Sequence, residues 1–309
     1  MPERLALTGA NGFVGRHLTA MAVERGWDVV GIVRSAAGAE AVQRAGGRPL
    51  IVSDLAGHSL ARALAGARVA VHLAHIGSEQ GDATYEAVNV HGTRHVVTAA
   101  RAADVARVVL FSGLGVARYG LAPRLTNRYF LSKLSAELEL FRSDRQAVVF
   151  RPSYIVGPGD GVVRMLLEGL AGGGLEVPGD GAYRMQPVFV EDAADAVLSA
   201  ASSAAPSTPP PHRVVDLVGP EPVSYRELIA SVARTARARG RPAHDQVREI
   251  AVDEAERRAR TGGFHGMGPD ELDCLLCDEV ADPRPLAALL GRPLTPLAAA
   301  LEAAVRGAA

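Results

Sequence analysis

The 309-residue sequence predicts an α/β fold in which helices cover both faces of a doubly wound parallel sheet. Short segments that are apolar at nearly every position, such as residues 106–111 and 147–151, alternate with helical segments along the first half of the chain. A strand buried on both faces needs this continuous apolar pattern, and alternation with helices is typical of a parallel sheet. Three glycines, Gly9, Gly12 and Gly15, also separate the first apolar segment from the first helix.

The expected elements follow one another in strand and helix order. We expect strands at residues 4–8, 27–33, 48–52, 68–73, 106–111 and 147–151. We expect helices at residues 16–25, 37–45, 59–64, 85–103 and 126–142. Each strand is a short apolar run, and Gly26 ends the first helix. Parallel strands joined through helices should be connected in the right-handed sense.

The character of the sequence changes after Pro152. Glycine-rich turns dominate residues 157–186, so we expect sparse regular structure there. Residues 187–190 predict a short strand that enters a helix, and the proline-rich residues 204–211 predict an extended surface linker. Residues 213–218 predict a strand that returns to the sheet, and the chain from Tyr225 onward is mostly helical.

Composition and charge exclude several classes of protein. Apolar residues make up 48% and charged residues 22% of the chain, which is ordinary for a globular protein. The net charge of −1 gives no electrostatic footprint for nucleic acid or for an anionic membrane. No apolar stretch approaches the ~18 residues of a spanning helix, and the start of the sequence has no signal-peptide pattern. We therefore expect a cytoplasmic protein with a small-molecule substrate, and leave open whether it forms a homodimer.

The three glycines predict a dinucleotide-binding turn. In Gly-x-x-Gly-x-x-Gly, the first glycine lets the chain turn, the second lets backbone approach a pyrophosphate, and the third allows close packing of helix on strand. The free N–H groups at the start of the helix would face the phosphates. We expect Asn11, Phe13 and Val14, which lie between these glycines, to contact the cofactor as well.

This turn defines the expected domains. We predict a dinucleotide-binding domain of the Rossmann type at residues 1–156, to which residues 187–219 return. We predict that residues 157–186 and 220–309 form a smaller, irregular and mostly helical substrate-binding domain.

The end of the second expected strand bears on the choice of cofactor. NAD-binding chains place a carboxylate there for the ribose 2′-hydroxyl, whereas this chain has Arg34 and Ser35. An arginine can instead hold a 2′-phosphate, and Arg16 could assist it. We therefore expect NADP rather than NAD, although Arg34 could equally be a solvated surface cation.

Among 33 Lys and Arg residues, Lys133 is the only lysine, and Tyr129 precedes it by one helical turn. Residues four apart on a helix share a face, so the ammonium and the phenol can meet. A nearby cation favours phenolate, and we expect Lys133 to lower the pKa of Tyr129. The pair therefore predicts a general acid or base made from tyrosine.

The cysteines and histidines do not predict a metal site. Cys274 and Cys277 form the only Cys-x-x-Cys pair, and we expect two reduced cysteines that pack as small apolar side chains. His91 and His95 lie four residues apart, but the glutamate of metalloprotease helices is missing between them.

Six segments in order resemble the extended and atypical short-chain dehydrogenases/reductases, which include the NAD-dependent epimerases and dehydratases. These segments are residues 8–15, 54–55, 72–74, 89–93, 129–133 and 151–158. The resemblance continues weakly through residues 186–193, and the C-terminal half is most similar to the branch with the NADPH-binding accessory subunit of respiratory complex I.

The resemblance implies further contacts with the cofactor. Asp54 and Leu55 would flank the adenine, and Asn89 would order the loop beside it. The residues expected on the ribose and nicotinamide side are Leu73, Ala74, His75, Pro152, Ser153, Tyr154 and Ile155. For Asp54, Asn89 and Pro152, a purely structural role is at least as well supported.

The resemblance also shows where this chain departs from the family. Ser112 follows the fifth strand directly, while the position where many extended members have the catalytic hydroxyl is Leu114. Ser112 is either that hydroxyl or a residue that caps or lines the cofactor pocket. The acid pair of the family's dehydratases is missing, which argues against sugar-nucleotide dehydration, and Tyr119 is expected to pack rather than react.

The resemblance implies a carbonyl reductase or alcohol dehydrogenase. NADPH would deliver hydride to a carbonyl carbon while Tyr129 protonates the oxygen. Lys133 would contact the cofactor ribose, and Ser112 would orient the substrate oxygen. Two alternatives stay open: an epimerase or isomerase that retains its cofactor, and a non-catalytic NADP(H)-binding scaffold. No motif identifies the substrate.

Overall fold

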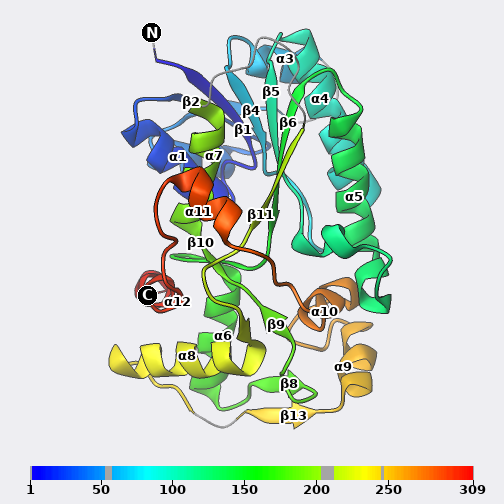
Figure 1. The fold of residues 1–309 in the computed structure, drawn as a ribbon, viewed down its shortest axis with the longest axis vertical. Coiled ribbons are helices and arrows are strands. Elements are labelled where there is room, and N and C mark those ends of the chain that lie inside the picture. The colour runs from blue at the N-terminus through cyan, green and yellow to red at the C-terminus, as the bar shows by residue number, and fades with distance from the viewer. Residues whose placement is uncertain (1, 53–57, 203–211, 245–246, 309) are drawn as a thin grey trace.

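The structure is a computed structural model that describes residues 2–52, 58–202, 212–244 and 247–308. Seven strands form one parallel sheet in the order β3-β2-β1-β4-β5-β6-β11 (Figure 1). Its strands are β1 (Arg4–Thr8), β2 (Asp28–Val33), β3 (Arg48–Ile51), β4 (Val69–His72), β5 (Arg107–Phe111), β6 (Gln146–Pro152) and β11 (Arg213–Leu217). This confirms the predicted doubly wound α/β fold. The strand order reverses between β1 and β4, where such sheets bind ligands at the carboxyl ends of their strands.

Helices cover both faces of this sheet. One face packs against α1 (Phe13–Glu24), α7 (Val190–Ser202) and α11 (Arg284–Leu290), and the other against α3 (His58–Leu64), α4 (Gly92–Ala102) and α5 (Arg128–Phe141). The helix α2 (Ala36–Arg44) lies beside β2 and β3. Side chains alternate between the two cores along each strand, so Leu5 and Leu7 enter one core and Ala6 the other.

The expectation of sparse regular structure at residues 157–186 is wrong. A twelve-residue helix, α6 (Gly161–Gly172), lies there and is followed by β8 (Glu176–Pro178) and β9 (Arg184–Met185). Asp160 caps α6, because its carboxylate accepts hydrogen bonds from Gly157 N and Val163 N at 2.9 and 2.7 Å. Four apolar side chains at helical spacing are buried on α6, and this period outweighs the glycine-rich turns on either side.

A second hydrophobic core lies beyond the carboxyl edge of the sheet, at the lower end of Figure 1. It is built by α6 together with α8 (Tyr225–Ala238), α9 (Val252–Ala259), α10 (Pro269–Leu275) and α12 (Leu297–Gly307). Three two-stranded pairs support it: β7 (Ile155–Val156) with β10 (Val188–Phe189), β9 with β12 (Val223–Ser224), and β8 with β13 (Arg248–Ile250). Two short 3-10 helices, η2 (Leu114–Arg118) and η3 (Pro123–Thr126), connect β5 to α5, and the linker expected at residues 204–211 falls outside the described residues.

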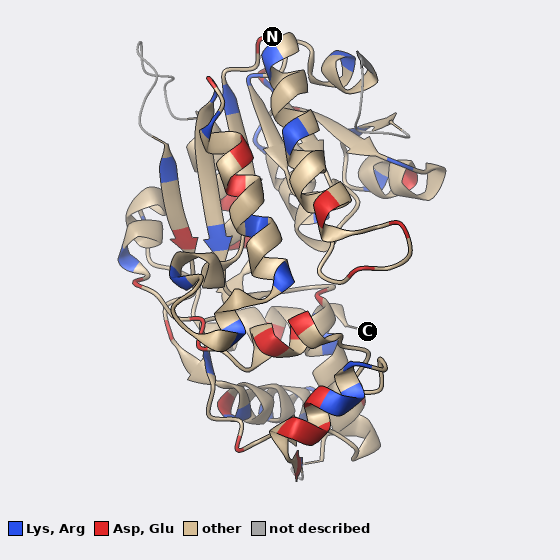
Figure 2. Cartoon of the chain, turned by 90° about the vertical axis from the view of Figure 1, so that its right-hand side faces the viewer, with Lys and Arg blue, Asp and Glu red and all other residues tan. Residues whose placement is uncertain are grey.

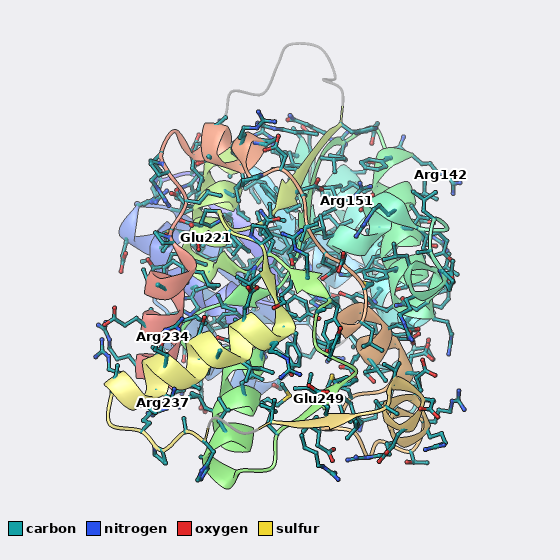
Figure 3. All side chains as sticks on the ribbon, turned by 60° about the horizontal axis from the view of Figure 1, so that its bottom comes forward. Arg142, Arg151, Glu221, Arg234, Arg237 and Glu249 are labelled. Carbon is teal, nitrogen blue, oxygen red and sulfur yellow. The ribbon has the colours of Figure 1, made fainter. Side chains whose placement is uncertain are left out.

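Figure 2 shows residues of both charges interspersed along the helices. Most arginines lie at the surface, and Arg142 and Arg234 are exposed examples (Figure 3). Arg151 of β6 is less exposed than these. Its guanidinium donates two hydrogen bonds, at 2.9 and 2.7 Å, to the fully buried Glu137 of α5. Within the described residues, no helix is both long enough and apolar enough to cross a membrane.

Replacing Glu137 with Ala should strongly destabilise the fold, since it leaves the Arg151 guanidinium half-buried without its partner. Loss of one partner of a buried pair typically costs about 3–5 kcal/mol. Chemical denaturation should show this loss in the free energy of unfolding. Glu40→Ala is the matched control, because Glu40 and Arg44 are exposed and 3.8 Å apart, and it should change stability by less than about 0.5 kcal/mol. Equal effects of the two substitutions would contradict the prediction.

Candidate active site

The glycine turn between β1 and α1 leaves no room for side chains. Gly9 has a φ of +72°, and a Cβ there would lie 2.7 Å from Ala74 N. A Cβ on Gly15 would lie 2.2 Å from Gly9 O, so only glycine lets α1 approach the turn this closely. Gly12 is the N-cap of α1, with no side-chain cap and no acidic residue in the first turn. The first N–H groups of α1 are therefore suited to a pyrophosphate.

The residues within and beside the turn have different roles. Asn11 is exposed, and its carbonyl oxygen accepts a hydrogen bond from Arg16 at 2.9 Å. Phe13 and Val14 are the first two residues of α1, and the Phe13 side chain also lines the cavity described below. This geometry fits a bound dinucleotide because the glycine turn and the helix terminus face the same point of strand reversal.

Asn89 orders the loop after β4. Its Oδ1 accepts from Ile76 N at 2.9 Å, and its Nδ2 donates to Ile76 O and to Ser132 Oγ at 3.1 and 3.0 Å. These bonds engage both polar atoms of the buried side chain, so Asn89 acts by positioning the loop. That loop contains Leu73 and His75, which are linked by a 2.9 Å hydrogen bond between His75 Nδ1 and Leu73 O.

Arg34 and Ser35 lie directly after β2, where the structure exposes both residues. Ser35 is the N-cap of α2, and its hydroxyl oxygen accepts from Gly38 N at 3.2 Å. No carboxylate occurs between Arg34 and Ala39. Asp54 and Leu55, which were expected beside the adenine, lie outside the described residues.

Tyr129 and Lys133 lie on α5, which begins after the N-cap Asn127. Lys133 is 3% exposed, and its Nζ donates a 2.9 Å hydrogen bond to the carbonyl oxygen of Phe111 at the end of β5. The same Nζ lies 5.8 Å from the centroid of the Tyr129 ring. The structure thus brings the predicted pair together beside the last residue of β5.

The expectation that Lys133 lowers the pKa of Tyr129 is wrong for this structure. Burial raises the pKa of Tyr129 well above its ordinary value, and the neighbouring Cys274 and Glu279 raise it further. Burial also lowers the pKa of Lys133 to about 7, against a smaller opposing effect of Glu137. Tyr129 therefore holds its proton at neutral pH, because loss of water outweighs a cation whose own charge is weakened by burial.

Two histidines beside this lysine are neutral. Burial, with Lys133 second, lowers the pKa of His72 to about 3. The Lys133 ammonium is the main cause that lowers the pKa of His75. His72 Nδ1 forms a 2.6 Å hydrogen bond with Thr8 Oγ1, which ties β4 to the end of β1. Of these three buried groups, Lys133 is therefore the one that can carry a positive charge near neutral pH.

Ser112 follows β5 and is 3% exposed. Its backbone N donates to Phe150 O at 2.8 Å, whereas its buried hydroxyl has no hydrogen-bond partner among the described residues. Ser112 and Tyr129 line the same cavity. Leu114 is buried within η2, and Tyr119 packs against the small apolar cluster around Phe130.

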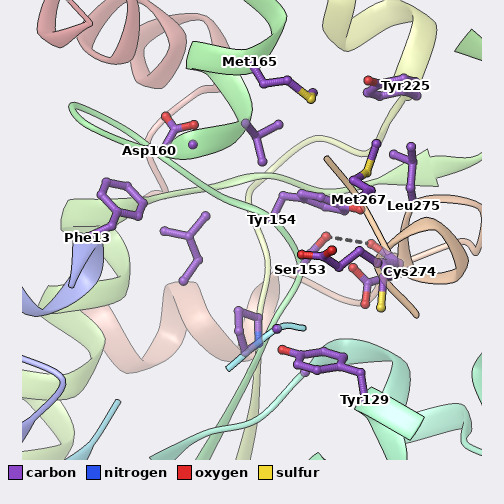
Figure 4. A pocket seen from close by; sticks show the side chains of 18 of the residues that line it. Phe13, Tyr129, Ser153, Tyr154, Asp160, Met165, Tyr225, Met267, Cys274 and Leu275 are labelled. Carbon is purple, nitrogen blue, oxygen red and sulfur yellow. Dashed lines mark hydrogen bonds between the residues drawn. The ribbon is translucent and has the colours of Figure 1, made fainter. Parts of the chain in front are cut away.

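A cavity of about 570 Å³ lies between the carboxyl edge of the sheet and the second core. Figure 4 shows Tyr129 on one side and Tyr154, Met267 and Cys274 across from it. Pro152 and Ile155 also line the cavity, whereas Ser153 Oγ is engaged by Glu279 O and Gln186 N, both at 3.1 Å. No Lys or Arg of the described residues lines it, but three carboxyl groups do: Asp160, Glu271 and Glu279.

Residues 265–279 contribute to this cavity and lie within the predicted substrate-binding region 220–309, but no motif indicated which of their side chains line it. Cys274 lines it, and Cys277 is buried against the cluster around Phe130. Both cysteines are free, and burial raises the pKa of each thiol. The described residues contain no cluster of side chains suited to a metal, and His91 contacts Glu86 at 3.0 Å.

Comparison with known proteins places the chain among enzymes of one family. Its residues 5–215 match the model of the NAD dependent epimerase/dehydratase family. It is 29% identical over 245 residues, 73% of each chain, to the 2-alkyl-3-oxoalkanoate reductase of Stenotrophomonas maltophilia. It is 32% identical over 172 residues, about half of each chain, to a 4-hydroxy-2-methyl-3-oxo-4-farnesyl-3,4-dihydroquinoline-1-oxide ketoreductase of Stigmatella aurantiaca.

A solved structure shows the same fold over the whole chain. The UDP-glucose 4-epimerase of Thermus thermophilus, determined with NAD, has a TM-score of 0.75 at 22% identity and covers 99% of this chain and 98% of its own. The similarity to the complex I accessory subunit stays a prediction. The chain belongs to the NAD-dependent epimerase/dehydratase family, within the extended short-chain dehydrogenases/reductases that its motifs resemble.

Proposed function

We propose that this protein is an NADP(H)-dependent oxidoreductase that reduces the carbonyl group of a small molecule. One observation carries the proposal: the unpartnered hydroxyl of Ser112 and the protonated phenol of Tyr129 line one cavity at the carboxyl edge of the sheet. A carbonyl oxygen bound between these two donors would accept a hydrogen bond from each. Lys133, fixed to Phe111 O, supplies positive charge next to the phenol.

The residues of the chain have separate roles in this reaction. When bound, the reduced nicotinamide supplies a hydride to the carbonyl carbon. Ser112 donates a hydrogen bond that orients the carbonyl oxygen. Tyr129 transfers its phenolic proton to that oxygen, so the ketone gains one hydride and one proton and becomes an alcohol. The Lys133 ammonium stabilises the phenolate that remains until solvent returns a proton.

The lining of the cavity supports a neutral, largely apolar substrate. A sugar nucleotide carries a diphosphate, whose binding needs cations or converging N–H groups. No Lys or Arg among the described residues lines the cavity, so a diphosphate would find no cationic side chain there. The reductase names above contain alkyl and farnesyl chains beside an oxo group, which supports a ketone with an apolar chain, and the alkanoate of the first name adds a carboxylate to such a chain. We therefore favour a reductase over an epimerase or a non-catalytic scaffold.

Arg34 supports NADP as the cofactor. It follows β2 with its side chain exposed, at the place where a carboxylate would select the unphosphorylated ribose of NAD. The structures of relatives named with NAD support a nicotinamide nucleotide in general.

Tyr129→Phe should lower the turnover of a ketone by roughly 10²-fold or more, because it removes the proton donor. The affinity for NADPH, measured by fluorescence titration, should stay nearly the same. The matched control is Tyr119→Phe, since Tyr119 packs outside the cavity. Turnover is measured as NADPH consumed per alcohol formed, and a one-to-one ratio excludes an epimerase that retains its cofactor. Unchanged turnover in Tyr129→Phe would disprove the proposed role.

Arg34→Ala should weaken NADPH binding about tenfold and leave NADH binding unchanged, because only NADPH carries the 2′-phosphate that the guanidinium would pair with. Dissociation constants for both nucleotides check this. Arg44→Ala on α2 serves as the control, since Arg44 is exposed and pairs with Glu40 instead. A similar loss of affinity for both nucleotides would contradict a role in selecting NADP.

A further inference from the structure

Glu279 is held rigidly at the wall of the cavity by its backbone. Its N–H donates to Arg184 O at 2.8 Å, and its carbonyl oxygen accepts from Ser153 Oγ at 3.1 Å. It also pairs with Met185 in an isolated parallel bridge beside β9. The segment therefore offers its side chain to the cavity at a fixed point.

The side chain of Glu279 is buried without an ion-pair partner among the described residues. The residue is 5% exposed, and no salt bridge of the described residues includes it. Gly115 N is its hydrogen-bond partner, with 3.3 Å between that N and Oε1. One long backbone hydrogen bond leaves the second oxygen of the carboxyl group available to a ligand.

The other two carboxyl groups of the cavity are already engaged. Both oxygens of Asp160 accept hydrogen bonds, one from Val163 N in α6 and the other from Gly157 N. Glu271 Oε2 accepts from Gly268 N at 2.8 Å at the start of α10. Glu271 is only half-buried, so Glu279 is the buried carboxyl group of the cavity that has a single, long hydrogen bond to the described protein.

We propose that Glu279 is a specificity-determining residue, which in its protonated form donates a hydrogen bond to a second oxygen of an apolar ketone substrate. The backbone N–H of Gly115 fixes Oε1 as the acceptor, so Oε2 carries the proton into the cavity. The substrate would then be a ketone with an ester or second carbonyl nearby. This inference rests on the proposed reduction of a ketone in the same cavity.

The surroundings of Glu279 keep the carboxyl group protonated at neutral pH. Burial raises the pKa of Glu279 to about 8, against smaller opposing effects of Gly115 N–H and Arg118. The titratable and charged groups that interact with it are Arg118, Tyr129, Tyr154, Cys274 and Cys277. The pKa values of both phenols and both thiols are raised, so these groups stay neutral as Glu279 titrates.

Calorimetric titration of the NADP⁺-loaded protein tests this assignment without turnover. The probes are ethyl butyrylacetate, which carries an ester carbonyl beside its ketone, and pentyl propyl ketone, which has the same chain without the ester. At about pH 6.5, wild type should bind the keto ester about fivefold more tightly than the ketone, the ratio that one hydrogen bond of ~1 kcal/mol gives. At about pH 9.5, where Glu279 has lost its proton, this preference should disappear.

Two substitutions separate recognition from support of the fold. Glu279→Leu should abolish the preference at both pH values. Glu279→Gln should keep the preference at both, because an amide N–H can donate and does not titrate in this range. Glu271→Gln is the matched control in the same cavity and should keep the pH dependence of wild type. If Glu279→Leu does not fold, the contrast between wild type and Glu279→Gln decides.

Several results would overturn the assignment. The first is an equal preference for the keto ester over the ketone in wild type and in Glu279→Leu. The second is a pH dependence of this preference that persists in Glu279→Gln. The third is tighter binding of the cationic probe diethylaminopentanone than of the ketone at about pH 6.5, which would make Glu279 a carboxylate site. Absence of NADPH oxidation with the same ketones would argue against the proposed function. The role of Glu279 in binding would still be tested by the comparison of affinities, which needs no turnover. If the protein does not bind NADP⁺, the same titrations of the keto ester and the ketone are carried out without nucleotide.

Discussion

The hydrogen bond from Lys133 to the carbonyl oxygen of Phe111 determines the geometry of the site. It joins α5 to the end of β5 and so places Tyr129 beside Ser112, the residue that follows that strand. Every other basic residue among the 33 is an arginine. A guanidinium is larger and cannot lose its proton, whereas a buried ammonium can shift its pKa. The unique lysine therefore lies at the end of β5, where a compact cation whose pKa can shift suits the site.

Burial moves the pKa values of the two members of this pair in opposite directions. It destabilises the phenolate of Tyr129 and the ammonium of Lys133, so the phenol keeps its proton while Lys133 titrates at about pH 7. A protonated phenol is the form that a proton donor to a carbonyl oxygen must have. The same loss of water leaves Ser112 with a buried hydroxyl that the protein does not satisfy, and a bound carbonyl oxygen would remove that cost.

The two halves of the chain contribute different parts of the proposed binding site. In the proposed function, the glycine turn, α1 and the loop ordered by Asn89 would hold the nucleotide, and the hydroxyls of the residue after β5 and of α5 would contact the substrate. The C-terminal helices close the cavity with apolar side chains and with the carboxyl group of Glu279. This lining carries no arginine or lysine of the described residues, so it offers no cationic side chain to the diphosphate of a sugar nucleotide. Under the proposed function, the fold of an epimerase family would serve a different class of ligand.

The sequence predicted features that depend on local pattern and missed those that depend on burial. The strands, the glycine turn and the Tyr129–Lys133 pair follow from apolar runs and from spacing on a helix, and the structure contains them. The pKa of Tyr129 could not be predicted, because spacing gives proximity to a cation but not the loss of water around it. Glu279 was missed for a related reason. It reaches the cavity through bonds to Arg184 and Ser153, which are remote in sequence from it and carry no motif.

The uniqueness of Lys133 makes the central claim directly measurable. Selective isotope labelling of lysine side chains should give one NMR signal from the single Nζ group, and its pH titration reports the pKa of Lys133 without further assignment. A buried ammonium held by Phe111 O should titrate at about 7 in the nucleotide-free protein. A midpoint near ~10.4, the value of a solvated lysine, would show that this side chain lies in water and would contradict the geometry on which the account of the site depends.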